Sequence, residues 1–208
     1  MREYRTVASP AEAEIVIKKS RFIAQVSPVA DEAEAAEFIA AIRKKHVNAA
    51  HNCHAYIVDN ITQRSSDDGE PSGTAGRPML EVLRKENLEH TAVVVTRYFG
   101  GILLGGGGLI RAYSQATKAG LDAAGMGRQL LFQRLTAVID YTAYGKLENQ
   151  LRERKLTVLD TAFTDVVRVE LGIAVGEIEQ LAAWLTDFCN GQLELIRGEE
   201  YYNFVRGI

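Results

Sequence analysis

The sequence predicts an α+β protein with two domains, residues 1–127 and 128–208. Its length of 208 residues allows one large domain or two small ones, at about 150 residues per domain. In the first half, strand-length apolar runs alternate with helical stripes. In the second half, the elements follow the order βαββαβ, which is typical of the ferredoxin-like fold. Gly125-Met126-Gly127 separates the two patterns.

The first half is predicted to be mixed α/β. Asp31 with Glu34 three residues later is the pattern of a helix-capping box. The apolar positions that follow recur with helical spacing. Residues 60–78 show no periodicity and are expected to be an irregular loop, which at that length is usually functional or disordered. We expect strands over 21–29, 51–59 and 91–99, a helix from Asp31, and helices over 79–86 and 109–124.

The second half has clearer periodicity. Strict alternation of apolar residues over 167–175 predicts a half-buried strand. Tyr144, Leu147 and Leu151 form one helical stripe, and a second helix is expected to end at Asn190-Gly191. The remaining strands are expected over 130–140, 156–163 and 193–197.

The net charge and the cysteine content argue against several classes of protein. The chain carries 24 Lys and Arg against 27 Asp and Glu, a net charge of −3, which disfavours nucleic-acid binding by bulk charge. A local basic patch fits the first domain better, because residues 1–129 hold 16 basic and 15 acidic side chains against 8 and 12 in the remainder. Two distant cysteines cannot form a disulfide framework. No signal peptide or membrane span is visible, so we expect a cytoplasmic protein.

The strongest local signal is a glycine cluster between a strand and a helix. Six of the 18 glycines fall within residues 100–108. Backbone N–H groups at such a position bind anions, while glycine also permits a tight turn and close packing. The pattern is neither a Walker A loop nor a dinucleotide fingerprint. The predicted anion or nucleic-acid contacts are Lys19, Arg21, Arg97, Gly100, Gly101, Gly105, Gly107, Gly108 and Arg111.

The second signal is the acidic segment Ser65–Gly76. Three carboxylates within four residues are suited to binding Mg²⁺ or to acid–base chemistry, but such residues more often stabilise turns. The spacing is not that of an EF-hand. We therefore favour structure or binding over catalysis. We expect polar contacts from this loop, facing the glycine cluster, by Asp67, Asp68, Glu70, Ser72 and Thr74.

Two further groups of residues have side chains that often bind metals or phosphates. His51 and Cys53 alternate with His54 across a strand, so the three cannot easily bind one zinc ion, and no metal site is predicted. Cys53 and Cys189 are expected to be buried thiols. The basic runs Lys18-Lys19-x-Arg21 and Arg43-Lys44-Lys45 would form a phosphate-binding surface if they lay beside the glycines.

Several of these segments resemble the IMPACT/YigZ family of largely uncharacterised proteins. The matching stretches include His51-x-Cys53-x-Ala55-Tyr56 together with residues 18–23, 66–80 and 97–109. The two-part layout resembles the bacterial YigZ type over the whole chain. His54 and Gly106 fall at variable positions of the family pattern.

The resemblance implies both a fold and a cellular process. It implies an N-terminal α/β sandwich of the type shared by a ribosomal protein, domain IV of elongation factor G and GHMP kinases. It also implies a ferredoxin-like C-terminal domain resembling other domains of that factor. Eukaryotic relatives inhibit activation of a stress kinase using an additional N-terminal module. For this chain, the implication is a looser link to translation or RNA.

Three functional hypotheses follow. The first is a non-enzymatic regulator that binds RNA or the ribosome, without a cofactor. The second is an enzyme that binds a phosphate or nucleotide with the glycine-rich and acidic loops, although no nucleophile–base pair or phosphate-gripping lysine appears. The third is a protein-interaction module that uses residues 60–78 with Tyr98 and Phe99. We favour the first.

Overall fold

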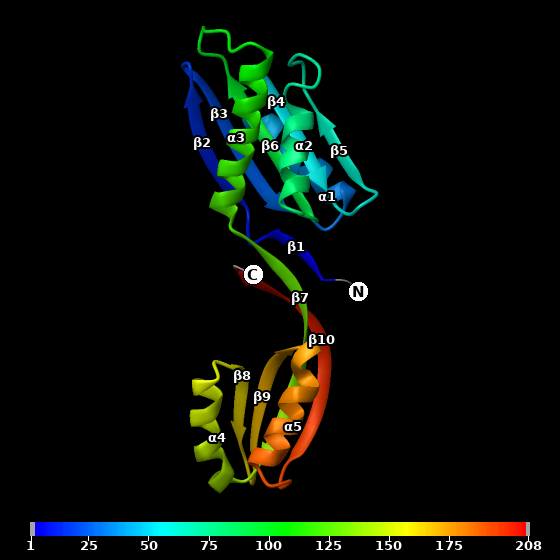
Figure 1. The fold of residues 1–208 in the computed structure, drawn as a ribbon, viewed down its shortest axis with the longest axis vertical. Helices are drawn as coiled ribbons and strands as arrows, with labels where there is room; N and C mark the ends of the chain where they lie inside the picture. The colour runs from blue at the N-terminus through cyan, green and yellow to red at the C-terminus, as the bar shows by residue number, and fades with distance from the viewer. Residues whose placement is uncertain (1–2, 207–208) are drawn as a thin grey trace. The chain divides into compact units, whose positions relative to one another are not determined.

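A computed structural model describes residues 3–206 of the chain (Figure 1). The fold is mixed α/β, with two antiparallel sheets and five α-helices among these residues. One compact unit comprises Tyr4–Gln129 with Phe204–Arg206, and the other is built mainly from Leu130–Asn203. The strand β7 (Met126–Ile139) runs through the predicted boundary and contributes residues to both units.

The N-terminal unit contains a sheet of five strands covered by helices on both faces. The strand order is β2-β3-β6-β4-β5, and every neighbouring pair is antiparallel. Its strands are β2 (Ala11–Ile17), β3 (Ser20–Pro28), β4 (His51–Ile57), β5 (Gln63–Ser66) and β6 (Thr91–Tyr98). Its helices are α1 (Glu32–Lys45), α2 (Gly76–Lys85) and α3 (Gly106–Ala124).

Alternation along the strands places apolar side chains on both faces of this sheet. Val93 and Val95 pack in the larger core beneath α2 and α3. Ala92 and Val94 pack in a smaller core with Ala35 of α1. The strand β6 is therefore buried on both sides, which explains its run of β-branched residues over 93–96.

The Asp31 half of the predicted capping box is confirmed at α1, while the Glu34 side chain accepts from the residue before the cap. The Asp31 carboxylate accepts a hydrogen bond from the Glu34 N–H at 2.9 Å, and Glu34 Oε2 accepts one from the Ala30 N–H at 2.5 Å. The segment 60–78 is more ordered than the sequence predicts, because it contains β5 and the first turn of α2. Strands β1 (Tyr4–Val7) and β2 were also not predicted.

The C-terminal unit follows the predicted order of elements. After β7 come α4 (Tyr141–Glu153), β8 (Thr157–Phe163), β9 (Val167–Ala174), α5 (Ile178–Phe188) and β10 (Glu194–Arg206). Its strands have the order β10-β7-β9-β8, and β1 pairs with the first residues of β7, Met126–Gln129, within the N-terminal unit. Both helices contribute to one core, where Leu147 and Leu151 of the predicted stripe are buried. The last strand is longer than the predicted 193–197.

No helix among residues 3–206 is long and apolar enough to cross a membrane.

Candidate functional site

Three connections meet at one end of the N-terminal unit. They are the β2–β3 turn, the segment between β5 and α2, and the glycine-rich segment between β6 and α3 (Figure 1). The predicted proximity of the acidic and glycine-rich loops is confirmed, because Glu70 bonds to residues on either side of the glycine cluster, Arg97 and Tyr113. We call this group of three connections the loop end.

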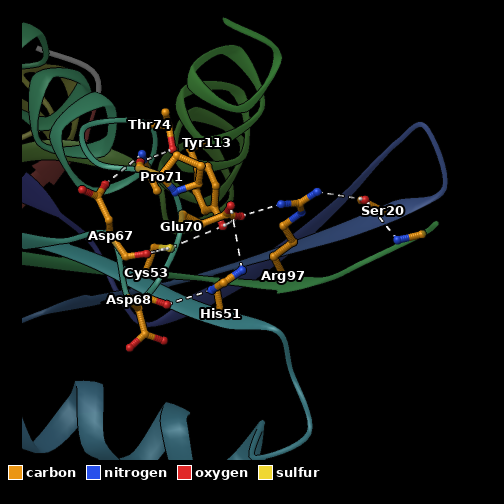
Figure 2. Close-up of polar contacts among 12 residues, drawn as sticks. Ser20, His51, Cys53, Asp67, Asp68, Glu70, Pro71, Thr74, Arg97 and Tyr113 are labelled. Carbon is orange, nitrogen blue, oxygen red and sulfur yellow. Dashed lines mark hydrogen bonds and ion pairs between the residues drawn. The ribbon is translucent and has the colours of Figure 1, made fainter. Parts of the chain in front are cut away.

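A buried carboxylate holds the loop end together. Arg97 Nη1 donates to Glu70 Oε1 at 2.6 Å, and the Tyr113 hydroxyl donates to the same oxygen at 2.8 Å (Figure 2). The side chains of Arg97 and Glu70 are 7% and 3% exposed. Removal of both charges from water is costly, and their mutual attraction offsets that cost. Arg97, predicted as an anion contact, therefore has an internal partner and does not lie on the surface.

Arg97 also connects β6 to the glycine cluster. Its guanidinium lies over the rings of Phe22 and Phe99, with centroid distances of 5.4 and 5.6 Å. Arg97 Nη2 lies 3.5 Å from Ser20 Oγ, which accepts a hydrogen bond from the Gly100 N–H at 3.1 Å. A Cβ atom at Gly100 would lie 2.0 Å from the Lys19 carbonyl carbon, so only glycine permits this approach.

His51 completes the contacts of Glu70. His51 Nδ1 lies 2.8 Å from the Asp68 carbonyl oxygen, which can only accept, so Nδ1 carries a proton. His51 Nε2 then faces Glu70 Oε2 at 3.9 Å (Figure 2). The imidazole is thus oriented by the acidic segment and directed towards the buried carboxylate.

The carboxylate of Asp67 caps helix α2. Its two oxygens accept hydrogen bonds from the N–H groups of Gly73, Ala75 and Gly76 at 2.8, 3.0 and 2.8 Å. Burial by itself raises the pKa of this carboxyl, but the three backbone donors outweigh burial and leave the pKa below its ordinary value. A negative charge at a helix N-terminus is favourable.

Asp68 is also engaged within the protein. One of its oxygens accepts from the Asn52 N–H at 2.6 Å, and the other forms an ion pair with Arg43 at 2.7 Å. All three predicted carboxylates, Asp67, Asp68 and Glu70, therefore have protein partners. Among residues 3–206 there is no group of three side chains that could bind a metal ion. Thr74 donates to the Pro71 carbonyl at 2.6 Å, while Ser72 is exposed.

The cysteine at this site is buried. Cys53 Sγ lies 2.9 Å from the Asp67 carbonyl oxygen and 3.3 Å from the Tyr113 hydroxyl. Burial raises the pKa of the Cys53 thiol to about 12, although the Tyr113 hydrogen bond opposes the shift. Burial also raises the pKa of Tyr113. Neither group is suited to act as a nucleophile at neutral pH.

The exposed cations of the loop end are Lys18, Lys19 and Arg111. The two lysines form the β2–β3 turn, both with positive φ (48° and 66°), and Gly100 packs against this turn. Arg111 Nη1 lies 3.9 Å from the position of a Cβ at Gly107, in the first turn of α3. Within the described chain, none of the three has an ion pair or a side-chain hydrogen bond.

Helix α3 begins without a side-chain cap. Its N-cap is Gly105, with φ of 71°, and its first turn has no acidic residue. Gly101 also has a positive φ, of 82°. Gly107 and Gly108 lie in the first turn, whose N–H groups have no partner within residues 3–206 apart from the start of the helical ladder at Leu109. An uncapped helix N-terminus attracts anions.

Most of the other predicted basic residues are neutralised within the protein, with Lys44 as the exception. Arg21 forms two hydrogen bonds with Glu14, at 2.7 and 2.8 Å. In the second basic run, Arg43 pairs with Asp68, and Lys45 pairs with Glu12 at 2.9 Å. The two basic runs therefore do not form one continuous surface of free charge.

The roles of Ser20, His51 and Tyr113 were not predicted from the sequence. Tyr113 does carry a detectable signal, because it shares a helical stripe with Leu109, Ala112 and Ala116, which is typical of a buried position. A buried tyrosine hydroxyl needs a hydrogen-bond partner. No comparable local signal exists for Ser20.

Comparison with known protein families gives a match that covers the loop end. The family profile described as the Impact N-terminal domain matches residues 18–121, which include the whole loop end. A chain of Bacillus subtilis described as IMPACT family member YvyE is 46% identical over 205 residues, covering 97% of this chain and 94% of the relative. The chain belongs to the IMPACT family.

Other members of the IMPACT family support the same assignment over both units. Escherichia coli YigZ is 35% identical and covers 96% of this chain and 100% of its own. A crystal structure described as that of a hypothetical protein has a TM-score of 0.60 at 31% identity, covering 96% of this chain and 98% of the other. Residues 138–192 match a domain of unknown function (DUF1949). Protein IMPACT of Rattus norvegicus is 35% identical over 100 residues, which cover 45% of this chain and 31% of the rat protein.

Proposed function

We propose that this IMPACT family protein is a non-enzymatic, translation-linked regulator that binds RNA, free or in the ribosome, through the loop end. The observation that carries the proposal is the free charge there. Arg111 lies beside the uncapped start of α3, and Lys18 and Lys19 form the turn against which Gly100 packs; no acidic side chain pairs with any of the three within the described residues. Cations and helix N-termini are the groups that contact phosphates in nucleic-acid interfaces.

Exposed apolar side chains lie on the same segment. Phe99, Ile102 and Leu103 are 52%, 42% and 81% exposed. Aromatic and apolar side chains beside cations are suited to unstacked bases of single-stranded RNA. The buried Glu70–Arg97 pair then acts as a support, because it holds the glycine segment and the acidic segment in place.

The alternative of a phosphate- or nucleotide-binding enzyme has less support. Asp67, Asp68 and Glu70 would have to bind Mg²⁺ or act as bases, yet each already accepts hydrogen bonds or an ion pair from the protein. Breaking those contacts would remove the cap of helix α2 or leave Arg97 buried without a counter-charge.

The fold assignment belongs to the same proposal. We infer that the N-terminal unit is an α/β sandwich of the ribosomal-protein and elongation-factor type, and that the C-terminal unit is ferredoxin-like. The sheet order β10-β7-β9-β8 with two helices in one core supports the second inference. Such a protein would act in the cytoplasm. The link to translation rests on this analogy of fold, and a fold does not determine function by itself.

Binding of a labelled single-stranded RNA to the intact protein tests the proposal. We expect binding that is weakened at least about tenfold in Lys18→Ala/Lys19→Ala/Arg111→Ala. A matched variant, Lys44→Ala/Lys146→Ala/Arg168→Ala, removes three exposed cations on α1, α4 and β9 and should bind like the parent. Equal loss in both variants, or no binding by the parent, would overturn the proposal.

A further inference from the structure

An open groove of about 440 Å³ lies between α2 and α3 of the N-terminal unit. Both helices cover the same face of the sheet (Figure 1). Its walls and floor include Arg77, Pro78, Val82, Lys85, Ile110 and Ser114.

The floor of the groove is apolar. Pro78 is buried and Val82 packs against the core, so the floor continues the core to the surface. Ile110 is 42% exposed although it lies on a helix that otherwise packs well. A branched apolar side chain exposed beside other apolar groups gains free energy when a partner covers it.

The α2 wall of the groove carries free positive charge. Arg77 and Lys85 are exposed, and neither forms an ion pair or side-chain hydrogen bond within residues 3–206. The acidic residue of the groove, Glu81, is paired with Arg84 at 2.7 Å. The groove is therefore cationic in a chain whose net charge is −3.

The spacing of the two cations specifies a partner. They are eight residues apart on one helix, which corresponds to about 12 Å along its axis. A groove between two helices has no strand edge, so it offers an extended peptide no ladder of backbone hydrogen bonds. A helix satisfies its own backbone and presents carboxylates two turns apart with apolar residues between them.

We propose that the α2–α3 groove binds an acidic amphipathic helix of a partner protein. Its carboxylates, about two turns apart, contact Arg77 and Lys85, and its apolar stripe covers Pro78, Val82 and Ile110. A nucleic-acid strand fits less well, because the groove lining, unlike the loop end with Phe99, contains no aromatic side chain on which a base could stack. This surface is independent of the RNA-binding proposal, since it uses none of Lys18, Lys19 and Arg111.

A display library of helical peptides selected on the intact protein tests this inference. We expect the enriched peptides to carry acidic residues about seven or eight positions apart around an apolar stripe, consistent with the helical rise. The best peptide, measured by fluorescence anisotropy, should lose about tenfold in affinity for Arg77→Ala/Lys85→Ala. It should lose more for Ile110→Glu, and an unchanged melting temperature would show that this variant remains folded.

The control variants separate this groove from the loop end. The peptide should bind Lys44→Ala and Lys18→Ala/Lys19→Ala like the parent, and single-stranded RNA should not displace it. Three results would each overturn the inference. They are enriched peptides that lack acidic residues seven or eight positions apart, a peptide affinity that is the same for the groove variants as for the parent, and displacement of the peptide by RNA.

Discussion

Arg97 Nη1 lies 2.6 Å from Glu70 Oε1, and this ion pair is almost completely buried. Glu70 belongs to the acidic segment, whereas Arg97 lies near the end of β6, immediately before the glycine cluster. The two residues are 27 positions apart in the sequence, so the pair holds the acidic segment against the start of the glycine-rich segment. Loss of either charge should therefore lower the stability of the fold.

Replacement of Glu70 by Gln should be strongly destabilising. The substitution leaves the Arg97 charge buried without a counter-charge, which costs about 3–5 kcal/mol. The matched control is Glu81→Gln, which breaks the exposed ion pair with Arg84 and should cost about 0–1 kcal/mol. Urea unfolding of both variants measures the difference. Similar losses in the two variants would show that the Glu70–Arg97 pair is not energetically special.

Asp67 should make folding sensitive to acid. Its pKa is lowered in the folded protein, so the stabilisation it provides is present above the ordinary aspartate pKa of about 3.9 and is lost as the pH falls through the folded value. Asp67→Ala should therefore lower the unfolding free energy by about 1–2 kcal/mol at neutral pH. The difference in unfolding free energy between the variant and the parent should shrink as the pH falls below the ordinary aspartate pKa. Denaturation at a series of acid pH values measures this difference. A difference that does not change with pH would contradict the capping account.

Cys53 should resist thiol reagents in the folded protein. With a pKa of about 12, its thiolate fraction at mildly alkaline pH is about three orders of magnitude below that of an unperturbed thiol. Labelling with a disulfide reagent, in a Cys189→Ser background, should become fast only after denaturant is added. Rapid labelling of the native protein would mean that Cys53 is exposed or activated.

Gly100 and Gly107 should respond differently to the same substitution. Gly100→Ala forces a methyl group into the Lys19 backbone, so both stability and RNA binding should fall. At Gly107 the nearest atom to a new Cβ is 3.9 Å away, and Gly107→Ala should be neutral or raise the melting temperature slightly. Calorimetry of the two variants checks the contrast. A tolerated Gly100→Ala would show that the turn and the glycine segment are not in close contact.

Local patterns predict most of the fold. The capping residues of α1, the β-branched run of β6 and the alternation of β9 all correspond to elements in the structure. The strand β5 is missed because its sequence, Gln-Arg-Ser-Ser, has no apolar residue and pairs only with β4 at the sheet edge. The strand β2 is missed although its residues alternate, because alanine occupies two of its apolar positions and Val16, at a polar position, is exposed.

The site is predicted less completely than the fold, for a physical reason. Sequence identifies the glycine and acidic segments and predicts that they are close. It cannot show that Arg97 is neutralised by a residue 27 positions earlier, or that Asp67 caps a helix that begins nine positions later. Those assignments depend on tertiary contacts, and they leave Lys18, Lys19 and Arg111 as the free cations of the loop end.

The salt dependence of RNA binding tests the central claim most directly. The affinity of the parent for single-stranded RNA should fall as salt rises, because phosphate contacts release counterions. Each cation that neutralises a phosphate of a single strand contributes about 0.7 to the slope of log affinity against log salt. In Lys18→Ala/Lys19→Ala/Arg111→Ala, the magnitude of that slope should therefore decrease by about two units. An unchanged slope in this variant, or a salt-independent affinity in the parent, would contradict the assignment of the loop end as a phosphate-binding surface.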